Sequence, residues 1–214
     1  MKSPTLSLFY FLTLSFFTLS LSAQDAYHQN LQVKLADEFN LPAGEFVLFD
    51  NETDLLNTAF NYGSNKQILD SEDTDFSQKV ILTVASQGAI PWDAGWGIGN
   101  QKRIEAGDKI LLVYHIRAIE EQGRVNSYVE RTSNFEKEAF YDLPIPLNWT
   151  TIYIPFEAKI SYAPGSLNFG FHLAHQAQIL ELGGFTAINY KKSQQLAWQE
   201  IVGKTTSIKV EFWI

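Results

Sequence analysis

Apolar residues recur at every second position in three segments of the chain, at residues 109–117, 125–132 and 167–173. This alternation is typical of β-strands that bury one face and expose the other. A fourth segment, Lys79–Ala85, is continuously apolar and rich in β-branched residues, which indicates a buried strand. Turn residues separate these segments, and no long segment has the period of an amphipathic helix. The pattern predicts an all-β sandwich or barrel.

Shorter strands are expected near Leu31–Leu35 and at Glu45–Phe49, Trp149–Phe156, Gln178–Leu182 and Phe185–Tyr190. Residues 51–78 are rich in Asn, Asp, Ser and Thr, and we interpret them as a long loop with room for a short strand around Ile68. Residues 133–148 contain Pro144 and Pro146, which indicates a second loop.

Side chains two residues apart in a strand share one face of the sheet, so the alternation also predicts which side chains reach the core. The apolar face of 167–173 must be core, and Tyr114 is expected there too. The opposite faces of three strands carry polar and aromatic side chains. If these strands share one concave sheet, they form a groove lined by His115, Arg117, Tyr128, Glu130 and His172.

Two tryptophans, Trp92 and Trp96, lie four residues apart in the stretch that leads into the strand 109–117. In an extended strand they would point the same way, with at least one in the core and the other at the rim of the groove. We expect replacement of Trp92 by Ala to destabilise the fold. Trp149 directly precedes an apolar strand and is expected in the core.

Composition and charge restrict the possible partners. The 214 residues carry 24 Asp and Glu against 16 Lys and Arg, a net charge of −8 at pH 7, without any run of basic residues. Nucleic acids and anionic membranes need clustered Lys and Arg, so neither is an expected partner. Cysteine is absent, which excludes a disulfide framework, a zinc–thiolate site and a cysteine nucleophile.

The N-terminal residues 1–23 have the pattern of a secretory signal peptide. Lys2 precedes the apolar run Leu6–Leu21, and small residues follow before Gln24. The alternative is an uncleaved membrane anchor, but the run is short for a membrane span and contains many hydroxyl groups. We therefore expect a secreted protein that is periplasmic, extracellular or on the cell surface, with no membrane contact in its mature form.

Three regions follow from this interpretation. They are the signal peptide at residues 1–23, a β-sandwich domain at 24–190, and a tail or closing strand at 191–214.

The order of the motifs resembles that of a known group of proteins. The sequence reads PWDAGW, GDKILLVYHIRA, VNSYVERT, NWTTIYIPF and GSLNFGFHLAHQAQILELGGFTAINY, in that order. It is similar to carbohydrate-binding modules of families 4 and 9, over roughly residues 60–190. This resemblance implies a jelly-roll sandwich with a galactose-binding-like fold, often attached to secreted xylanases. Residues 191–214 follow the sandwich here, and we expect this segment to be too short for a catalytic domain.

The resemblance also implies a polysaccharide ligand, similar to xylan or β-glucan, held by a monomer without catalysis. Aromatic faces stack on sugar rings, and planar polar groups bind sugar hydroxyls. The expected carbohydrate-binding residues are Trp92, Trp96, His115, Arg117, Tyr128, Glu130, His172 and Gln178, the last at the family's glutamine position. The alternative for the groove is a solvated sheet face with Arg–Glu pairs across strands.

Catalytic and metal-binding motifs are not evident. The four histidines lack the HExxH spacing, and no pair of carboxylates marks a glycosidase site. We expect no catalytic residue, no metal ligand and no cofactor. A structural calcium ion, for which Asp37, Glu38, Asp50 and Glu52 are candidates by charge only, is left open. The alternative functions are a component or fragment of a glycoside hydrolase, and a surface sandwich that binds proteins.

Overall fold

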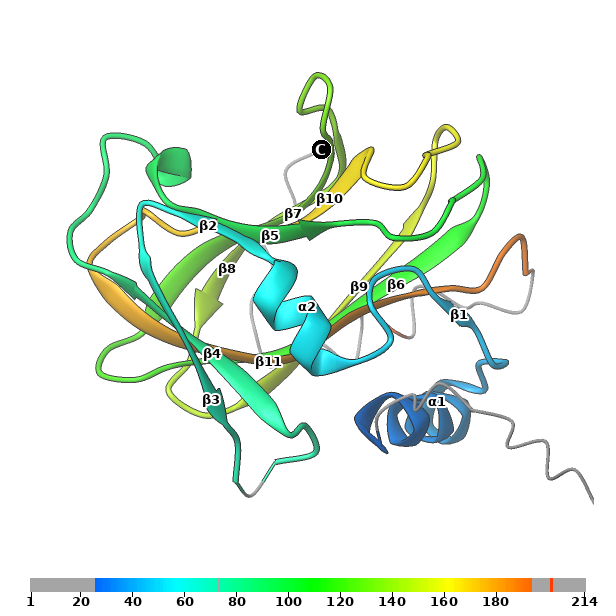
Figure 1. Cartoon of the computed structure of the whole chain (residues 1–214), viewed down its shortest axis with the longest axis horizontal. Helices are drawn as coiled ribbons and strands as arrows, with labels where there is room; N and C mark the ends of the chain where they lie inside the picture. Colours follow the sequence, from blue (N-terminus) through cyan, green and yellow to red (C-terminus); the bar gives the residue numbers. More distant parts are fainter. Residues whose placement is uncertain (1–25, 73, 194–200, 202–214) are drawn as a thin grey trace, which may run out of the picture.

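The computed structural model describes residues 26–72, 74–193 and 201, which fold into two antiparallel β-sheets packed face to face (Figure 1). In this part of the chain, sheet A contains β3 (Asn65–Asp70), β4 (Gln78–Val84), β11 (Gln178–Asn189), β6 (Lys109–Ala118) and β9 (Thr150–Glu157) in that order, with β1 (Glu45–Phe46) paired to β11. Sheet B contains β2 (Phe60–Tyr62), β5 (Gly95–Gly99), β10 (Leu167–His172), β7 (Gly123–Arg131) and β8 (Lys137–Ile145). The prediction of an all-β jelly-roll sandwich is confirmed.

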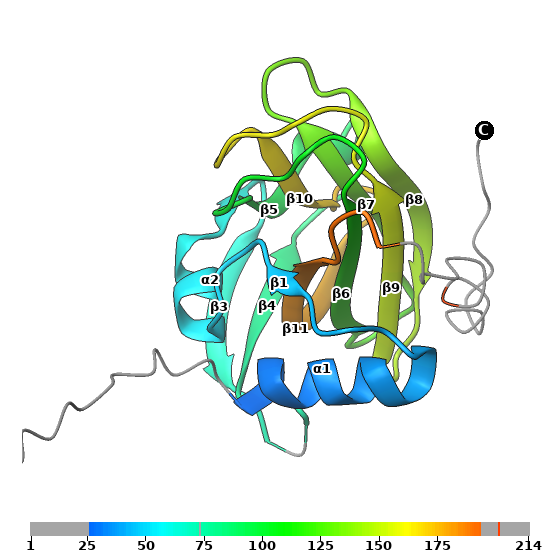
Figure 2. The same ribbon diagram turned by 90° about the vertical axis from the view of Figure 1, so that its right-hand side faces the viewer.

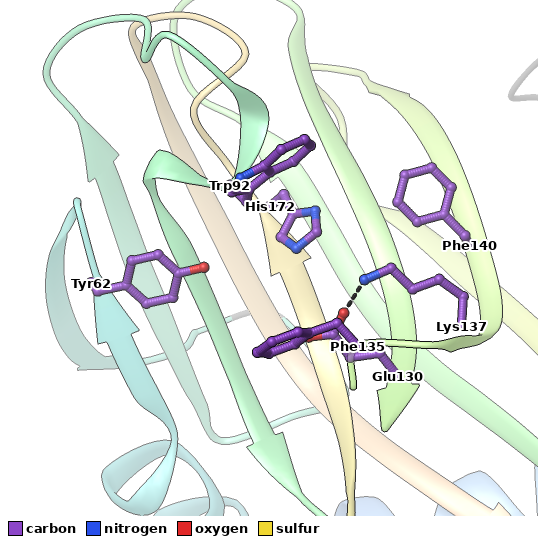
Figure 3. A pocket seen from close by; sticks show the side chains of 7 residues that line it. All are labelled: Tyr62, Trp92, Glu130, Phe135, Lys137, Phe140 and His172. Atoms are coloured by element: carbon purple, nitrogen blue, oxygen red, sulfur yellow. Dashed lines mark hydrogen bonds and ion pairs between the residues drawn. The ribbon is translucent and has the colours of Figure 1, made fainter. Parts of the chain in front are cut away.

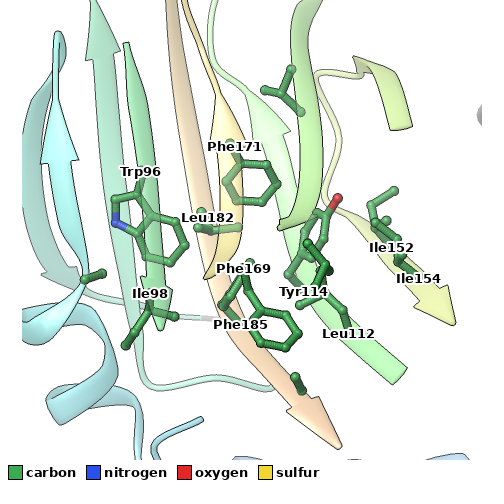
Figure 4. Close-up of a cluster of buried hydrophobic side chains, with 14 of the residues drawn as sticks. Trp96, Ile98, Leu112, Tyr114, Ile152, Ile154, Phe169, Phe171, Leu182 and Phe185 are labelled. Carbon is green, nitrogen blue, oxygen red and sulfur yellow. The ribbon is translucent and has the colours of Figure 1, made fainter. Parts of the chain in front are cut away.

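The core lies between the two sheets and is rich in aromatic side chains (Figure 4). Trp96 from β5 stacks on Phe171 from β10, with ring centroids 5.9 Å apart, and meets the edge of the Phe185 ring at 4.9 Å. Tyr114 stacks on Phe185 from the same sheet, with centroids 5.6 Å apart. The alternation therefore predicted correctly that Tyr114 and Phe171 point inwards.

A helix covers part of the outer face of sheet A. Helix α1 (Ala26–Phe39) lies across the strands of this sheet (Figure 2). Its buried residues Leu31 and Leu35 pack in one cluster with Leu111 and Val113 of β6. At Leu111 and Val113 the outer face of β6 is thus buried by α1, while the inner face of the strand packs against sheet B.

The strand expected near Leu31–Leu35 is therefore wrong. Leu31, Val33 and Leu35 alternate as in a strand, but Tyr27, Leu31 and Leu35 are also spaced four apart, which is the period of one helix face. The structure follows the second pattern, and Val33 is left 61% exposed.

The two regions expected to be loops also contain regular elements. Residues 51–78 include α2 (Glu52–Thr58), whose N-terminus is capped by the Asn51 side chain, followed by β2 and β3. Residues 133–148 include β8, where Pro144 is tolerated because β8 is an edge strand of sheet B. Residues 178–189 form one strand, β11, with an irregularity between Gly183 and Thr186.

The expected signal peptide at residues 1–23 lies outside the described residues, as does most of the tail at 191–214. No helix among the described residues is long and apolar enough to span a membrane.

Candidate functional site

The outer face of sheet B carries a pocket of about 710 Å³, within the range of ligand-binding sites (Figure 3). We call it the groove, and the residues that line it are Tyr62, Trp92, Glu130, Phe135, Lys137, Phe140 and His172. Four of these seven residues are aromatic rings that remain between 42% and 67% exposed. The groove therefore offers apolar ring faces in an open site.

Glycines on β5 shape one side of the groove. Tyr62 and Phe60 of the edge strand β2 lie directly opposite Gly95 and Gly97 of β5. A Cβ atom at Gly95 would lie 2.6–2.8 Å from the Tyr62 ring, and one at Gly97 would lie 2.8 Å from Cζ of Phe60. The two rings can therefore lie across β5 only because it has no side chains on that face.

The remaining rings come from the other edge of the sheet and from two loops. Phe140 stands on the outer face of β8, opposite Tyr128 of β7. Trp92 lies in a short 3₁₀ turn, Pro91–Asp93, which directs its ring to the groove, where it meets His172 edge-on with centroids 6.0 Å apart. Figure 3 shows Tyr62, Trp92, Phe140 and Phe135 on different sides of His172.

Phe135 is held in a conformation that its side chain disfavours. It lies between β7 and β8 with φ of 59°, in the left-handed region, and is 67% exposed. Its backbone N–H donates to the carbonyl of Arg131 at 3.0 Å, which closes the turn. A bulky, exposed ring in this region does not stabilise the fold, and it adds an apolar surface to the groove.

We expect Phe135→Gly to increase the free energy of unfolding by about 0.5–1 kcal/mol, because glycine adopts this φ without steric cost. Phe135→Ala is the matched control, since it removes the same ring but keeps the Cβ atom. Urea denaturation of both variants provides the measurement. Equal stability of the two variants would show that the backbone conformation is not strained.

The centre of the groove is a stack of Tyr128, His172 and Lys137. Tyr128 is only 2% exposed, because the His172 ring lies 4.5 Å from its centroid and the Lys137 ammonium lies 5.0 Å from it. The Lys137 ammonium is also paired with the carboxylate of Glu130. Tyr128 therefore supports the side chains that line the groove and does not itself offer an open stacking face.

Burial lowers the pKa of His172 to about 4, and the positive charges of Lys137 and His175 act in the same direction. Burial likewise lowers the pKa of His115, on sheet A, to about 4. Both imidazoles are thus neutral at neutral pH.

These two histidines should make stability depend on pH. Between the usual pKa of 6.5 and the folded value of about 4, the unfolded chain binds more protons than the folded chain. The stabilisation is complete above pH 6.5 and is lost as the pH falls to about 4. We expect urea midpoints of His172→Gln and His115→Gln to vary less with pH across this window than those of the wild type. Identical slopes in all three proteins would contradict this.

A polar cluster continues the same face of sheet B beyond His172. Asn126 of β7 lies opposite both His172 of β10 and Asp142 of β8. The Asn126 amide oxygen lies 3.0 Å from Nε2 of His175, and Asp142 forms a two-point ion pair with Arg124. Arg124 lowers the pKa of Asp142, so this cluster contains a carboxylate that stays ionised. Planar amide, imidazole and guanidinium groups thus lie at one end of an apolar groove.

The structure brings only some of the predicted binding residues together. Trp92, Glu130 and His172 line the groove, with Tyr128 beneath them. Trp96 is fully buried in the core, whereas Trp92 points to the groove. The two side chains point in different directions because Trp92 lies in a 3₁₀ turn and not in the strand that contains Trp96. The expectation that Trp92 supports the fold is contradicted by its exposure of 54%.

Gln178 does not lie in the groove. Its side chain is buried between the sheets, where it accepts from the backbone N–H of Arg124 and donates to the carbonyls of Arg124 and Leu173. It therefore fixes the start of β7 against the loop that follows β10.

His115 and Arg117 lie on the wrong sheet for the predicted groove. Both stand on the outer face of β6, which belongs to sheet A, whereas the groove lies on sheet B. His115 Nδ1 lies 3.0 Å from the Thr151 hydroxyl, beneath α1. Arg117 binds the buried carboxylate of Glu181 at 2.5 Å and stacks on Trp149 at 4.9 Å. Trp149 is itself only half-buried on this outer face, and not in the core as predicted.

Four groove residues were missed by sequence reasoning, namely Tyr62, Phe135, Lys137 and Phe140. All four lie in segments that were interpreted as loops. The alternating glycines of GWGIG were a usable signal, since a strand without side chains on one face invites a close approach by neighbouring groups.

No cluster of three or more metal-ligating side chains occurs in the described ranges. Of the carboxylates considered for calcium, Glu52 accepts hydrogen bonds from the backbone and side chain of Ser77 and thereby fixes the β3–β4 loop.

The chain resembles known proteins in its fold and not in its sequence. No protein-family model matches the sequence, and no curated protein sequence matches it. Solved structures do match. A CBM4 module superposes with a TM-score of 0.51 at 15% identity, over 62% of this chain and 95% of that one. The CBM22-1 xylan-binding domain from Paenibacillus barcinonensis Xyn10C gives 0.51 at 12% identity, over 71% and 98%.

The chain shares the jelly-roll fold of these carbohydrate-binding modules. The CBM22-1 and GH10 modules of a Clostridium thermocellum endo-1,4-β-D-xylanase, solved with xylohexaose, also match, with a TM-score of 0.53 at 10% identity. That match covers 69% of this chain but only 29% of the xylanase chain. The predicted resemblance to modules of this type is thus confirmed at the level of the fold.

Proposed function

We propose that this protein binds an uncharged polysaccharide of the xylan or β-glucan type in the groove of sheet B, without catalysis. The observation that carries the proposal is the set of exposed rings of Tyr62, Trp92, Phe135 and Phe140 around one open pocket. The C–H faces of pyranose rings are apolar and stack on such rings. Monomeric proteins rarely expose so many large apolar side chains at one place without a binding role.

Polar groups in and beside the groove suit sugar hydroxyls. The neutral His172 ring and the Lys137–Glu130 pair lie within the groove, and Asn126, His175 and the Arg124–Asp142 pair follow at one end. Each can donate or accept a hydrogen bond, and an unpaired partner would cost about 1–3 kcal/mol, which favours a fitting sugar over others.

A binding role is favoured over hydrolysis. A glycosidase uses two carboxylates on either side of the scissile bond. Among the residues that line the groove, Glu130 is the one carboxylate, and Lys137 already neutralises it. The proposal also draws on the structural neighbours, one of which is described as a xylan-binding domain. Together with the expected signal peptide, this suggests a secreted accessory to polysaccharide degradation.

Affinity gel electrophoresis tests the proposal. The purified protein should migrate more slowly in gels that contain xylan or β-glucan than in gels without polysaccharide, with a dissociation constant of about micromolar to millimolar. Mannan and pectin gels show whether the interaction is selective. Unchanged migration of the folded protein across all polysaccharides would reject the proposal and favour a protein partner for the exposed rings.

A further inference from the structure

A β-bulge determines which charged side chain enters the groove. In β8, Phe140 and Asp142 point to the groove face, so regular alternation would place Glu138 there as well. The β7–β8 register instead shifts between Val129 and Glu130, and Glu130 pairs with Lys137. Such bulges commonly redirect side chains beside functional sites.

The bulge turns Glu138 away from the groove. Its side chain is fully buried, where it accepts hydrogen bonds from the Tyr162 hydroxyl and from the backbone N–H of Lys159 at 3.1 Å, and pairs with Arg131 at 3.5 Å. Without the bulge, two carboxylates, Glu130 and Glu138, would face each other across neighbouring strands. With it, a carboxylate and an ammonium group do so.

The resulting ion pair neutralises the groove. The Glu130 side chain is only 7% exposed, and the Lys137 ammonium is held between this carboxylate and the Tyr128 ring. At the end of the same face, Arg124 is likewise paired with Asp142. Among the residues that line the groove, Lys137 is the one lysine or arginine, so the groove offers no unpaired lysine or arginine to an anionic ligand.

We propose that the Lys137–Glu130 pair makes the groove selective for uncharged polysaccharides and against chains that carry carboxylates or sulfates. This inference rests on the proposed function and names a selectivity determinant for it. A uronate in the groove would lose its hydration without gaining a free cation, which is costly. It would also lie near the Glu130 carboxylate, a repulsion of the kind by which binding sites exclude wrong partners.

Two cellulose ethers with the same backbone provide the probe, because hydroxyethyl cellulose is neutral and carboxymethyl cellulose is anionic. A neutral arabinoxylan and an acidic glucuronoxylan form a second pair. We expect the wild type to bind the neutral member of a pair at least about tenfold more tightly. Glu130→Gln frees the Lys137 ammonium, and we expect this variant to bind carboxymethyl cellulose. Added salt should weaken that binding, since exposed charges are screened.

Glu181→Gln is the matched control. Glu181 is also a buried carboxylate paired with a lysine, Lys79 at 2.6 Å, but it lies on sheet A. It changes the net charge equally and should bind carboxymethyl cellulose no better than the wild type. Glu157→Gln, at an exposed position on β9, supplies the same charge change with little effect on folding. Thermal unfolding shows that each variant is folded.

These measurements test the selectivity inference separately from the proposed function. Measurable and equal binding of the wild type to neutral and anionic polymers overturns the inference, and so does a Glu130→Gln variant that binds anionic polymer no better than the wild type. If Glu130→Gln gains anionic binding while no protein binds neutral polymers, the role of the ion pair stands and the proposed function fails. If neutral polymers bind but Glu130→Gln gains nothing, the proposed function stands and this inference fails.

Discussion

Trp96→Ala is expected to lower the free energy of unfolding by about 3–5 kcal/mol, the usual cost of removing a fully buried large aromatic side chain. Trp96 has no exposed surface and contacts rings from both sheets, stacking on Phe171 and meeting Phe185 edge-on. Its loss would therefore open a cavity at the interface of the two layers. A domain of typical stability would keep only a fraction of its free energy of unfolding after this substitution.

Urea denaturation followed by circular dichroism measures this effect. Trp92→Ala is the natural control, because the same residue type is removed four positions away from a 54% exposed site. We expect its cost to stay below about 1 kcal/mol. Comparable losses in both variants would mean that the core assignment of Trp96 is incorrect.

The largest expected effect on binding comes from the rings of the groove. Trp92→Ala should weaken polysaccharide binding by about tenfold, and the double variant with Tyr62→Ala by roughly a hundredfold, since each stacked ring contributes about 1–1.5 kcal/mol. The two side chains approach the groove from different elements, the 3₁₀ turn and β2, so their effects should be nearly additive.

Arg117→Ala and Trp149→Ala serve as controls for this series. Both residues belong to the outer face of sheet A and contact each other there, far from the groove on sheet B. Their replacement should leave polysaccharide binding unchanged. A loss of binding in these variants, with none in Trp92→Ala, would move the binding site to the other sheet.

The sequence predicted which face of a strand is buried better than it predicted which sheet the strand joins. The alternation placed Tyr114 and Phe171 correctly in the core. It also placed His115 and Arg117 correctly on the opposite face of β6, but strand pairing over long separations put that face on the other sheet. Parity is a local property, whereas sheet membership depends on contacts between distant residues.

Local irregularities account for two of the four groove residues that were missed, Lys137 and Phe135. The bulge at Glu138, opposite Val129 and Glu130, reverses the parity of Lys137 and Glu138, so counting by two from Phe140 would have placed the wrong residue in the groove. The left-handed conformation of Phe135 contradicts its own residue preference. Neither feature leaves a mark in the sequence that residue preferences detect.

The glycine-lined side of the groove has a consequence for the thermodynamics of binding. Gly95 and Gly97 are buried beneath the Tyr62 and Phe60 rings, so on this side a ligand meets the Tyr62 ring, which already rests on sheet backbone. A ring packed on sheet backbone in this way has little rotamer freedom left to lose when a ligand arrives. The conformational entropy lost on binding therefore falls mainly on the exposed side chains of Trp92 and Phe135, and calorimetry of their alanine variants should show a less unfavourable entropy of binding.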